Sequence, residues 1–95
     1  MKNRMVLKFD SLSENESFAR NVIASFLLPL NPNIAELTDI KTAVSEAATN
    51  AIVHGYPDTV GEVTMLAEID DENATVIIRS HGAGRKVYDE IRAKG

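Results

Sequence analysis

The chain has 95 residues, of which 44% are hydrophobic and 25% are charged, and its formal net charge is −4. This length fits a single domain, and the acidic balance argues against nucleic acid as the main partner, because duplex binding usually needs a basic face. The chain contains no cysteine, which excludes disulfides and thiolate metal sites. No segment has the length of a membrane span or the apolar core of a signal peptide, so we expect a cytoplasmic protein that does not bind a membrane.

A short strand and an amphipathic helix are predicted first along the chain. In residues 4–10, Met5, Leu7 and Phe9 lie on one side, as in a short strand. Ser13 followed by Glu16 fits a capping box and predicts that a helix begins here. The apolar residues of this helix form a broad stripe that should pack on the rest of the protein.

A second and longer helix is predicted over residues 34–54. Asn33 and Glu36 repeat the capping pattern at its start, and Gly55 and Pro57 indicate its end. Its apolar face contains several alanines. Their small side chains allow a close approach to the element on which the helix packs.

Two strands and a last helix are predicted after the second helix. Residues 62–69 alternate, with Val63, Met65, Ala67 and Ile69 on one face. The segment ATVIIR, residues 74–79, is predicted as the next strand, and the short polar segment between the two predicts a hairpin. The glycine-containing segment SHGAGR follows. Residues 85–94 are predicted to form a short helix, with Tyr88 and Ile91 among its inward-facing residues.

The predicted order of elements is therefore β-α-α-β-β-α, in one α/β (α+β) domain over residues 1–95. Each long helix has one apolar stripe and each strand has one apolar face. The simplest arrangement is a two-layer sandwich, in which the helices pack on one face of a mixed or antiparallel sheet.

Three polar residues, Glu46, Asn50 and His54, recur every four positions on the second helix. At 100° per residue they fall within about 80° of one another on the margin of the apolar face, so we expect them to be half covered. An amide oxygen suits a hard cation such as Mg²⁺, and a carboxylate can position or deprotonate a nucleophile. On spacing alone, solvated boundary residues without a function are the alternative.

The segment EAATNAIVHGY, residues 46–56, resembles the N-box of the GHKL ATPase superfamily, in which a helix carries a glutamate and an asparagine four residues apart. Residues 1–79 more narrowly resemble the anti-sigma-F factors of spore-forming bacteria, over MKNRMVLKF, LSENESFAR and ELTDIKTAVSEAATNAIVHGY. The resemblance implies a shortened Bergerat-like sandwich. It also implies a regulator of transcription during sporulation.

For activity and partners, the resemblance implies a serine/threonine kinase that binds ATP with Mg²⁺. Such a protein binds a sigma factor as a dimer and phosphorylates an anti-anti-sigma protein. By position, Asn50 would ligate Mg²⁺, Glu46 would act as the general base or orient the attacking serine hydroxyl, and His54 would lie near the phosphates. Arg20 on the first helix would belong to the partner-binding surface, with a solvated helix arginine as the alternative.

The segment after the hairpin departs from the family's pattern. The family has D-x-G-x-G, in which the aspartate accepts a hydrogen bond from the adenine amino group and the glycines let the backbone approach the nucleotide. Here Ser80, Gly82 and Gly84 occupy these positions. Loss of a buried directional partner commonly costs about 1–3 kcal/mol, so we expect ATP binding to be impaired.

Residues 80–95 no longer follow the family's sequence, and we expect a foreign C-terminal helix on a truncated, recombined or engineered chain, a chimera. Two functions therefore stay open. The first is an anti-sigma-factor-like serine kinase module with little activity. The second is a non-catalytic folded scaffold that self-associates as a homo-oligomer through sheet surfaces left exposed.

Overall fold

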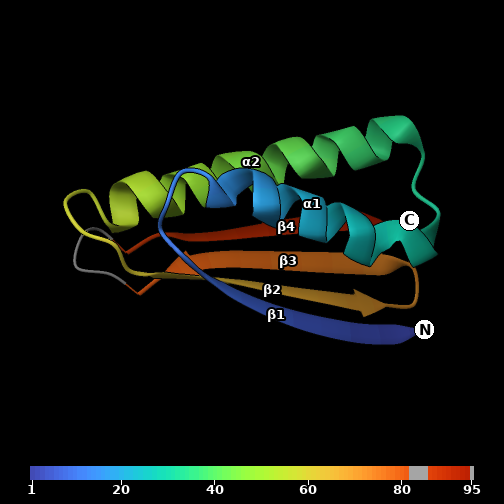
Figure 1. The fold of residues 1–95 in the computed structure, drawn as a ribbon. Helices are drawn as coiled ribbons and strands as arrows, with labels where there is room; N and C mark the ends of the chain where they lie inside the picture. The colour runs from blue at the N-terminus through green and yellow to red at the C-terminus, as the bar shows by residue number, and fades with distance from the viewer. Residues whose placement is uncertain (82–85, 95) are drawn as a thin grey trace.

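The computed structural model describes residues 1–81 and 86–94, which form two helices on a four-stranded sheet (Figure 1). The strands pair antiparallel in the order β1-β2-β3-β4, and both helices lie on one face of the sheet. The predicted two-layer α+β sandwich is confirmed. The elements are β1 (Lys2–Asp10), α1 (Asn15–Leu27), the 3-10 turn η1 (Leu28–Leu30), α2 (Ile34–Gly55), β2 (Glu62–Asp70), β3 (Asn73–Ser80) and β4 (Tyr88–Lys94).

The two long helices begin in different ways. At the start of α2, the Asn33 side chain accepts a hydrogen bond from the Glu36 N–H at 2.8 Å, and Glu36 Oε1 accepts one from the Asn33 N–H at 3.1 Å. This capping box is confirmed. The capping box predicted at Ser13 is wrong, because α1 has Glu14 at its N-cap, with no side-chain cap hydrogen bond. Asn15, the first residue of α1, donates from its side chain to the Asp10 carbonyl at 2.8 Å and from its N–H to the Leu12 carbonyl at 2.9 Å.

The hairpin predicted from residues 62–69 and 74–79 is confirmed, and it is formed by β2 and β3. The two strands pair from Val63 opposite Ser80 to Asp70 opposite Asn73. The turn between them places Asp71 in the left-handed region, with φ of 57°. A short polar side chain tolerates this conformation better than most others do.

The predicted C-terminal helix is wrong, because residues 88–94 form strand β4. In its pairing with β3, Ile91 lies opposite Val76 and Ala93 lies opposite Ala74. Helical spacing placed Tyr88 on the inward face with Ile91, but side chains alternate along a strand, and Tyr88 is 60% exposed. Pairing satisfies the backbone groups on the second edge of β3, which a short helix cannot do. The order of elements is therefore β-α-α-β-β-β.

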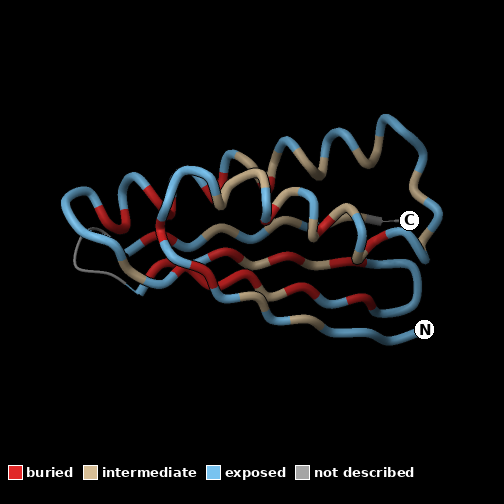
Figure 2. The backbone as a smooth tube through the Cα atoms, viewed as in Figure 1, coloured by how far each residue is buried: buried red, intermediate tan, exposed pale blue. Residues whose placement is uncertain are grey.

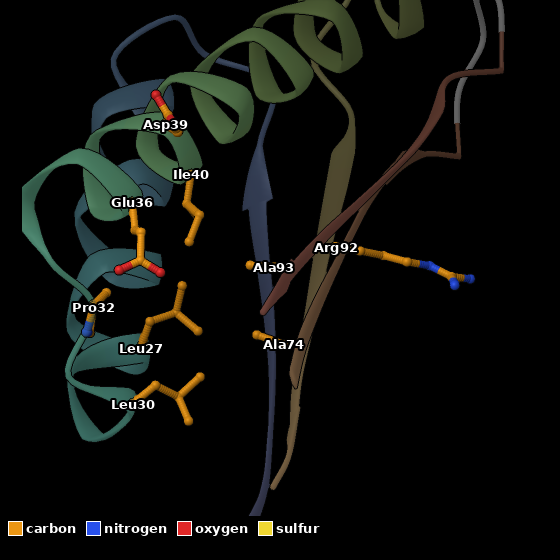
Figure 3. A pocket seen from close by; sticks show the side chains of 9 residues that line it. All are labelled: Leu27, Leu30, Pro32, Glu36, Asp39, Ile40, Ala74, Arg92 and Ala93. Carbon is orange, nitrogen blue, oxygen red and sulfur yellow. The ribbon is translucent and has the colours of Figure 1, made fainter. Parts of the chain in front are cut away.

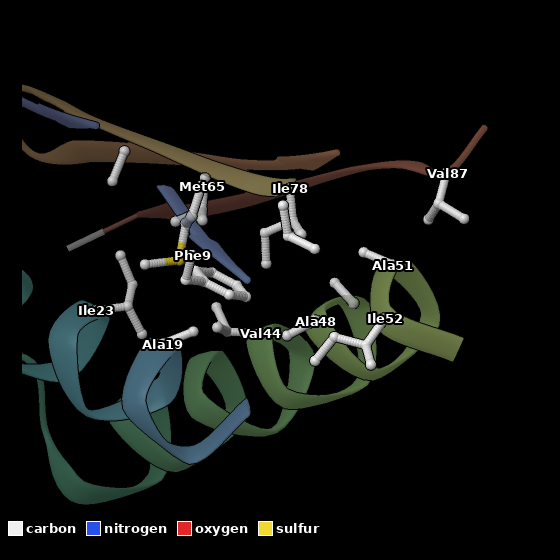
Figure 4. Close-up of a cluster of buried hydrophobic side chains, with 14 of the residues drawn as sticks. Phe9, Ala19, Ile23, Val44, Ala48, Ala51, Ile52, Met65, Ile78 and Val87 are labelled. Atoms are coloured by element: carbon white, nitrogen blue, oxygen red, sulfur yellow. The ribbon is translucent and has the colours of Figure 1, made fainter. Parts of the chain in front are cut away.

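The hydrophobic core lies between the two layers (Figures 2 and 4). Ile23 of α1 and Val44 of α2 face Met65 and Ile78 of the sheet, and all four side chains are fully buried. Buried alanines of α2 complete the helix side of the core. Because these alanines are small, α2 can lie close to the sheet.

Tyr56 joins the C-terminal end of α2 to the ends of two strands. Its hydroxyl donates to the Glu62 carbonyl and accepts a hydrogen bond from the His81 N–H at 3.0 Å. His81 Nε2 in turn lies 2.9 Å from Thr64 Oγ1. A Cβ atom on Gly61 would lie 2.0 Å from the Tyr56 ring, so a glycine is needed there. These contacts hold the end of α2 in place over the sheet.

Candidate functional site

The row of Glu46, Asn50 and His54 lies on the C-terminal half of α2, and all three residues are exposed. The expectation that they would be half covered is wrong. The helix contacts the sheet through short side chains such as Ala48 and Ala51, which are fully buried. The row lies just outside this buried stripe, so its polar groups are accessible to solvent and to a ligand.

Asn50 and His54 line an open hollow of about 300 Å³ together with residues 86–89. The hollow therefore combines an amide, an imidazole, the ammonium group of Lys86 and the carboxylate of Asp89. Asp89 lies opposite Ile78 in the sheet. Residues opposite each other share a face, and Ile78 is buried beneath the helices, so Asp89 lies on the helix side as well.

Asp89 was missed by the sequence analysis because residues 85–94 were assigned to a helix. A strand period in YDEIRAK would have placed Asp89, Ile91 and Ala93 on one face. The two apolar members of this set were the available signal.

A second hollow lies between α1 and α2. It is lined by Arg20, Thr38, Lys41, Thr42, Ser45 and Glu46. The Arg20 guanidinium is held at this place, because Nη1 donates to Glu16 Oε1 at 3.0 Å and to Ser45 Oγ at 3.4 Å. Lys41 adds a second cation that the sequence analysis did not single out.

The hollows share residues and so form one surface. Ser45 and Glu46 also line a third hollow with Thr49 and Asn50. Asn50 in turn belongs to the hollow that contains His54. The structure thereby connects Arg20, Glu46, Asn50 and His54 along one side of α2, and we call this continuous strip the α2 polar surface.

Ser80 lines none of the three hollows, although it contacts Val87 of the hollow that contains Asn50, and it is only 6% exposed. Its hydroxyl accepts a hydrogen bond from the Val87 N–H at 3.0 Å, and its own N–H donates to the Val87 carbonyl at 3.0 Å. The Val87 side chain is also buried, near Ala51 (Figure 4). Ser80 therefore holds the entry to β4 against β3. Gly82 and Gly84, the other predicted nucleotide-binding residues, lie outside the described residues.

The side chains of the surface fit a metal-bound phosphate only in part. Within residues 1–81 and 86–94, no group of three or more His, Cys, Asp or Glu side chains could hold a metal ion. A Mg²⁺ ion would depend on the Asn50 oxygen and the Asp89 carboxylate, with water or phosphate oxygens as its other ligands. Lys86 and His54 could contact the phosphate oxygens.

Among the described parts of the chain, no helix is long and apolar enough to cross a membrane.

Comparison with known proteins gives one consistent result. The sequence pattern of the histidine kinase-like ATPase domain family matches residues 9–94. The chain is 52% identical over 93 residues to the Anti-sigma F factor of Shouchella clausii, and 48% identical over 93 residues to that of Bacillus subtilis. It is 50% identical over 84 residues to the Anti-sigma F factor of Clostridium acetobutylicum.

These matches cover more of the chain than residues 1–79, to which the resemblance to anti-sigma-F factors was limited. The two 93-residue matches cover 97% of this chain, and the family pattern reaches residue 94, so the similarity does not end near residue 79 as expected. Residues 80–94 belong to the matched region. The chain spans 64% of the length of these two relatives and 59% of the third.

Proposed function

Because the chain belongs to the family of histidine kinase-like ATPase domains, we propose that it is the nucleotide-binding part of an anti-sigma factor that binds a sigma factor and so regulates transcription. The observation that carries this proposal is the α2 polar surface, which connects Arg20 with Asn50 and His54. The hollows share Ser45 and Glu46, so two ligands on this surface would be neighbours and could change each other's affinity through direct contacts. A nucleotide at one end of this surface could thereby regulate a protein bound at the other end.

The sigma factor is proposed as the partner because the similar proteins carry the name Anti-sigma F factor. Its contact is assigned to the hollow between α1 and α2, where Arg20 and Lys41 offer two cations to an acidic side chain. Bonds to Glu16 and Ser45 already restrict the Arg20 side chain, so less conformational entropy is lost on binding. The role in sporulation, the dimeric state and an anti-anti-sigma partner stay predictions.

For the nucleotide, Asn50 is assigned as an oxygen ligand of Mg²⁺, and His54 and Lys86 as contacts of the phosphates. When bound, ATP would supply the phosphoryl group for transfer to a serine of a partner protein. Glu46 lines both the hollow that contains Arg20 and the hollow that contains Asn50. This shared position supports the proposal that Glu46 acts as a general base or an orienting carboxylate between the partner and the nucleotide.

Ser80 supports weak rather than strong ATP binding. At the position that the family resemblance assigns to adenine recognition, the hydroxyl is buried and accepts a hydrogen bond from Val87 within the chain. A serine also lacks the charge and reach of an aspartate. A non-catalytic module that binds the sigma factor without turnover is therefore the second candidate function.

A self-associating scaffold is supported by a separate surface. Val6, Leu66 and Ile77 lie opposite one another across the outer face of β1, β2 and β3. Val6 is exposed, and Leu66 and Ile77 are only partly buried, since no described element covers this face. Such an apolar row favours association with a second copy.

Asn50→Ala is expected to weaken Mg²⁺-dependent ATP binding by at least about tenfold. Asn50 is exposed, so the substitution removes the proposed metal ligand and leaves the core intact. The measurement is isothermal titration of ATP with Mg²⁺ into the wild-type protein and the variant. Asn21→Ala, at an exposed position of α1 that lines none of the three hollows, is the matched control. Equal ATP affinity of the two variants would show that Asn50 does not contribute to nucleotide binding.

Ser80→Asp is expected to raise ATP affinity by about one order of magnitude, because a carboxylate gains a charged hydrogen bond to the adenine amino group. The same titration measures this gain. Ser80→Ala, which removes the hydroxyl that accepts from Val87, should lower the stability without improving ATP binding. If Ser80→Asp folds but binds ATP no better than the wild type, Ser80 is not the cause of weak binding.

A further inference from the structure

A cavity of about 220 Å³ lies between the layers, near the N-terminal end of α2 (Figure 3). On the helix side it is lined by Leu27, Leu30 and Ile40, and on the sheet side by Ala74 and Ala93. The two alanines are direct neighbours across β3 and β4. The cavity exists because three large side chains face two methyl groups, which leave the space between them unfilled.

The charged residues around this apolar cavity are not equivalent. Glu36 extends from α2 on the cavity side, whereas Arg92 points away from the cavity across the far side of the sheet (Figure 3). Asp39 also points away from the cavity. Glu36 Oε1 accepts the Asn33 N–H in the capping box, and this bond fixes the carboxylate in place. Its other oxygen accepts no hydrogen bond from the described part of the chain. One oriented negative group therefore stands at an otherwise apolar space.

We propose that this cavity binds a small apolar molecule that carries one ammonium group, of the arylalkylamine class. Its volume exceeds that of the cavity of about 150 Å³ known to admit benzene, so a phenyl ring with a short alkyl chain fits. The apolar walls favour the ring, and the Glu36 carboxylate attracts an ammonium group and repels an anion. The net charge of −4 on the protein likewise attracts a cation and repels an anion.

The test uses 2-phenylethylamine, with 2-phenylethanol as the neutral analogue and 3-phenylpropionate as the anionic one. Each is titrated into the ¹⁵N-labelled protein, and amide chemical shifts are followed by NMR. The amine is expected to bind about fivefold more tightly than the alcohol, as for a partly exposed ion pair, and the propionate more weakly than both. The largest shifts should fall at Ile40, Ala74 and Ala93. Equal binding of the three compounds, no binding of the amine, or shifts elsewhere would overturn the proposal.

Two substitutions test whether the negative charge of Glu36, rather than a change in the fold, determines the preference for the amine. Glu36→Gln keeps a side chain that can complete the capping box, and it is expected to remove the preference for the amine over the alcohol. Asp58→Asn removes a charge at an exposed position that lines no part of the cavity, and it should leave the preference unchanged. If Glu36→Gln retains the full preference, the carboxylate does not recognise the ligand and the proposal fails.

A third variant tests whether the ligand occupies the cavity. Ala93→Leu should fill the cavity and weaken the binding of both the amine and the alcohol by at least about tenfold. Unchanged binding in a folded variant would place the ligand elsewhere and overturn the proposal. If this variant does not fold, the comparison of Glu36→Gln with the wild type still decides the outcome. Neither ATP nor a sigma factor is present in these titrations, so the result is independent of the proposed function.

Discussion

Ile23→Ala is expected to lower the free energy of unfolding by about 3 kcal/mol, because it removes three carbons from a fully buried side chain and leaves a cavity. Ile23 lies where α1 meets the sheet, close to Met65 and Phe9 (Figure 4). A single domain is commonly stable by only about 5–15 kcal/mol, so this change removes a large part of the total. Urea unfolding followed by circular dichroism measures it, since the chain has no tryptophan.

The control for this experiment is the same substitution at Ile34. This residue is 86% exposed at the first position of α2, so Ile34→Ala should change the free energy of unfolding by less than about 0.5 kcal/mol. Similar losses at both positions would mean that Ile23 is not packed between the layers. A loss at Ile34 alone would indicate that its exposed side chain contacts another molecule.

Arg20→Glu is expected to weaken sigma-factor binding by about 10- to 100-fold. The substitution reverses the charge that the hollow between α1 and α2 offers to the partner. It also places two carboxylates beside each other, because Glu16 now pairs with Arg20 at 3.0 Å. The measurement is the dissociation constant with a purified sigma factor of the F type, by surface plasmon resonance at two salt concentrations.

Arg79→Glu makes the same change of charge at a position far from this hollow. Arg79 is exposed on β3, and its neighbours Ile78 and Ser80 face the helices, so its side chain lies on the opposite face of the sheet. It should leave the dissociation constant within about twofold of the wild-type value. Equal effects of the two variants would show that total charge, rather than the hollow, determines binding. Thermal unfolding of each variant shows whether the fold is retained.

The sequence could predict the features that depend on residues close together in the chain. The alternation in residues 62–69 indicated β2, because side chains along a strand face opposite sides of a sheet, and the short apolar segment after the polar turn indicated β3. Asn33 and Glu36 indicated the start of α2 because a capping box is closed within one turn of a helix. The four-residue spacing of Glu46, Asn50 and His54 likewise placed them on one side of that helix.

The tertiary structure decided the features that depend on distant pairing. Residues 88–94 form a strand because β3 offers them an unpaired edge, and this long-range gain outweighs their local helical spacing. That pairing places Asp89 beside Asn50 and His54, and it brings Val87 to the hydroxyl of Ser80. The spacing of the sequence indicates at most which face of β4 carries Asp89, and it does not indicate the neighbours of Asp89 on α2 or the contact of Val87 with Ser80.

The sequence by itself therefore determined the helices, the hairpin and the residue types of the α2 polar surface, since short-range geometry specifies these. Only the tertiary structure decided how the hollows along α2 connect, and where two alanines of neighbouring strands leave a cavity next to Glu36. The physical reason is that packing between layers depends on pairs of residues far apart in the chain. The register of β4 against β3 sets those pairs, as Ala93 opposite Ala74 illustrates.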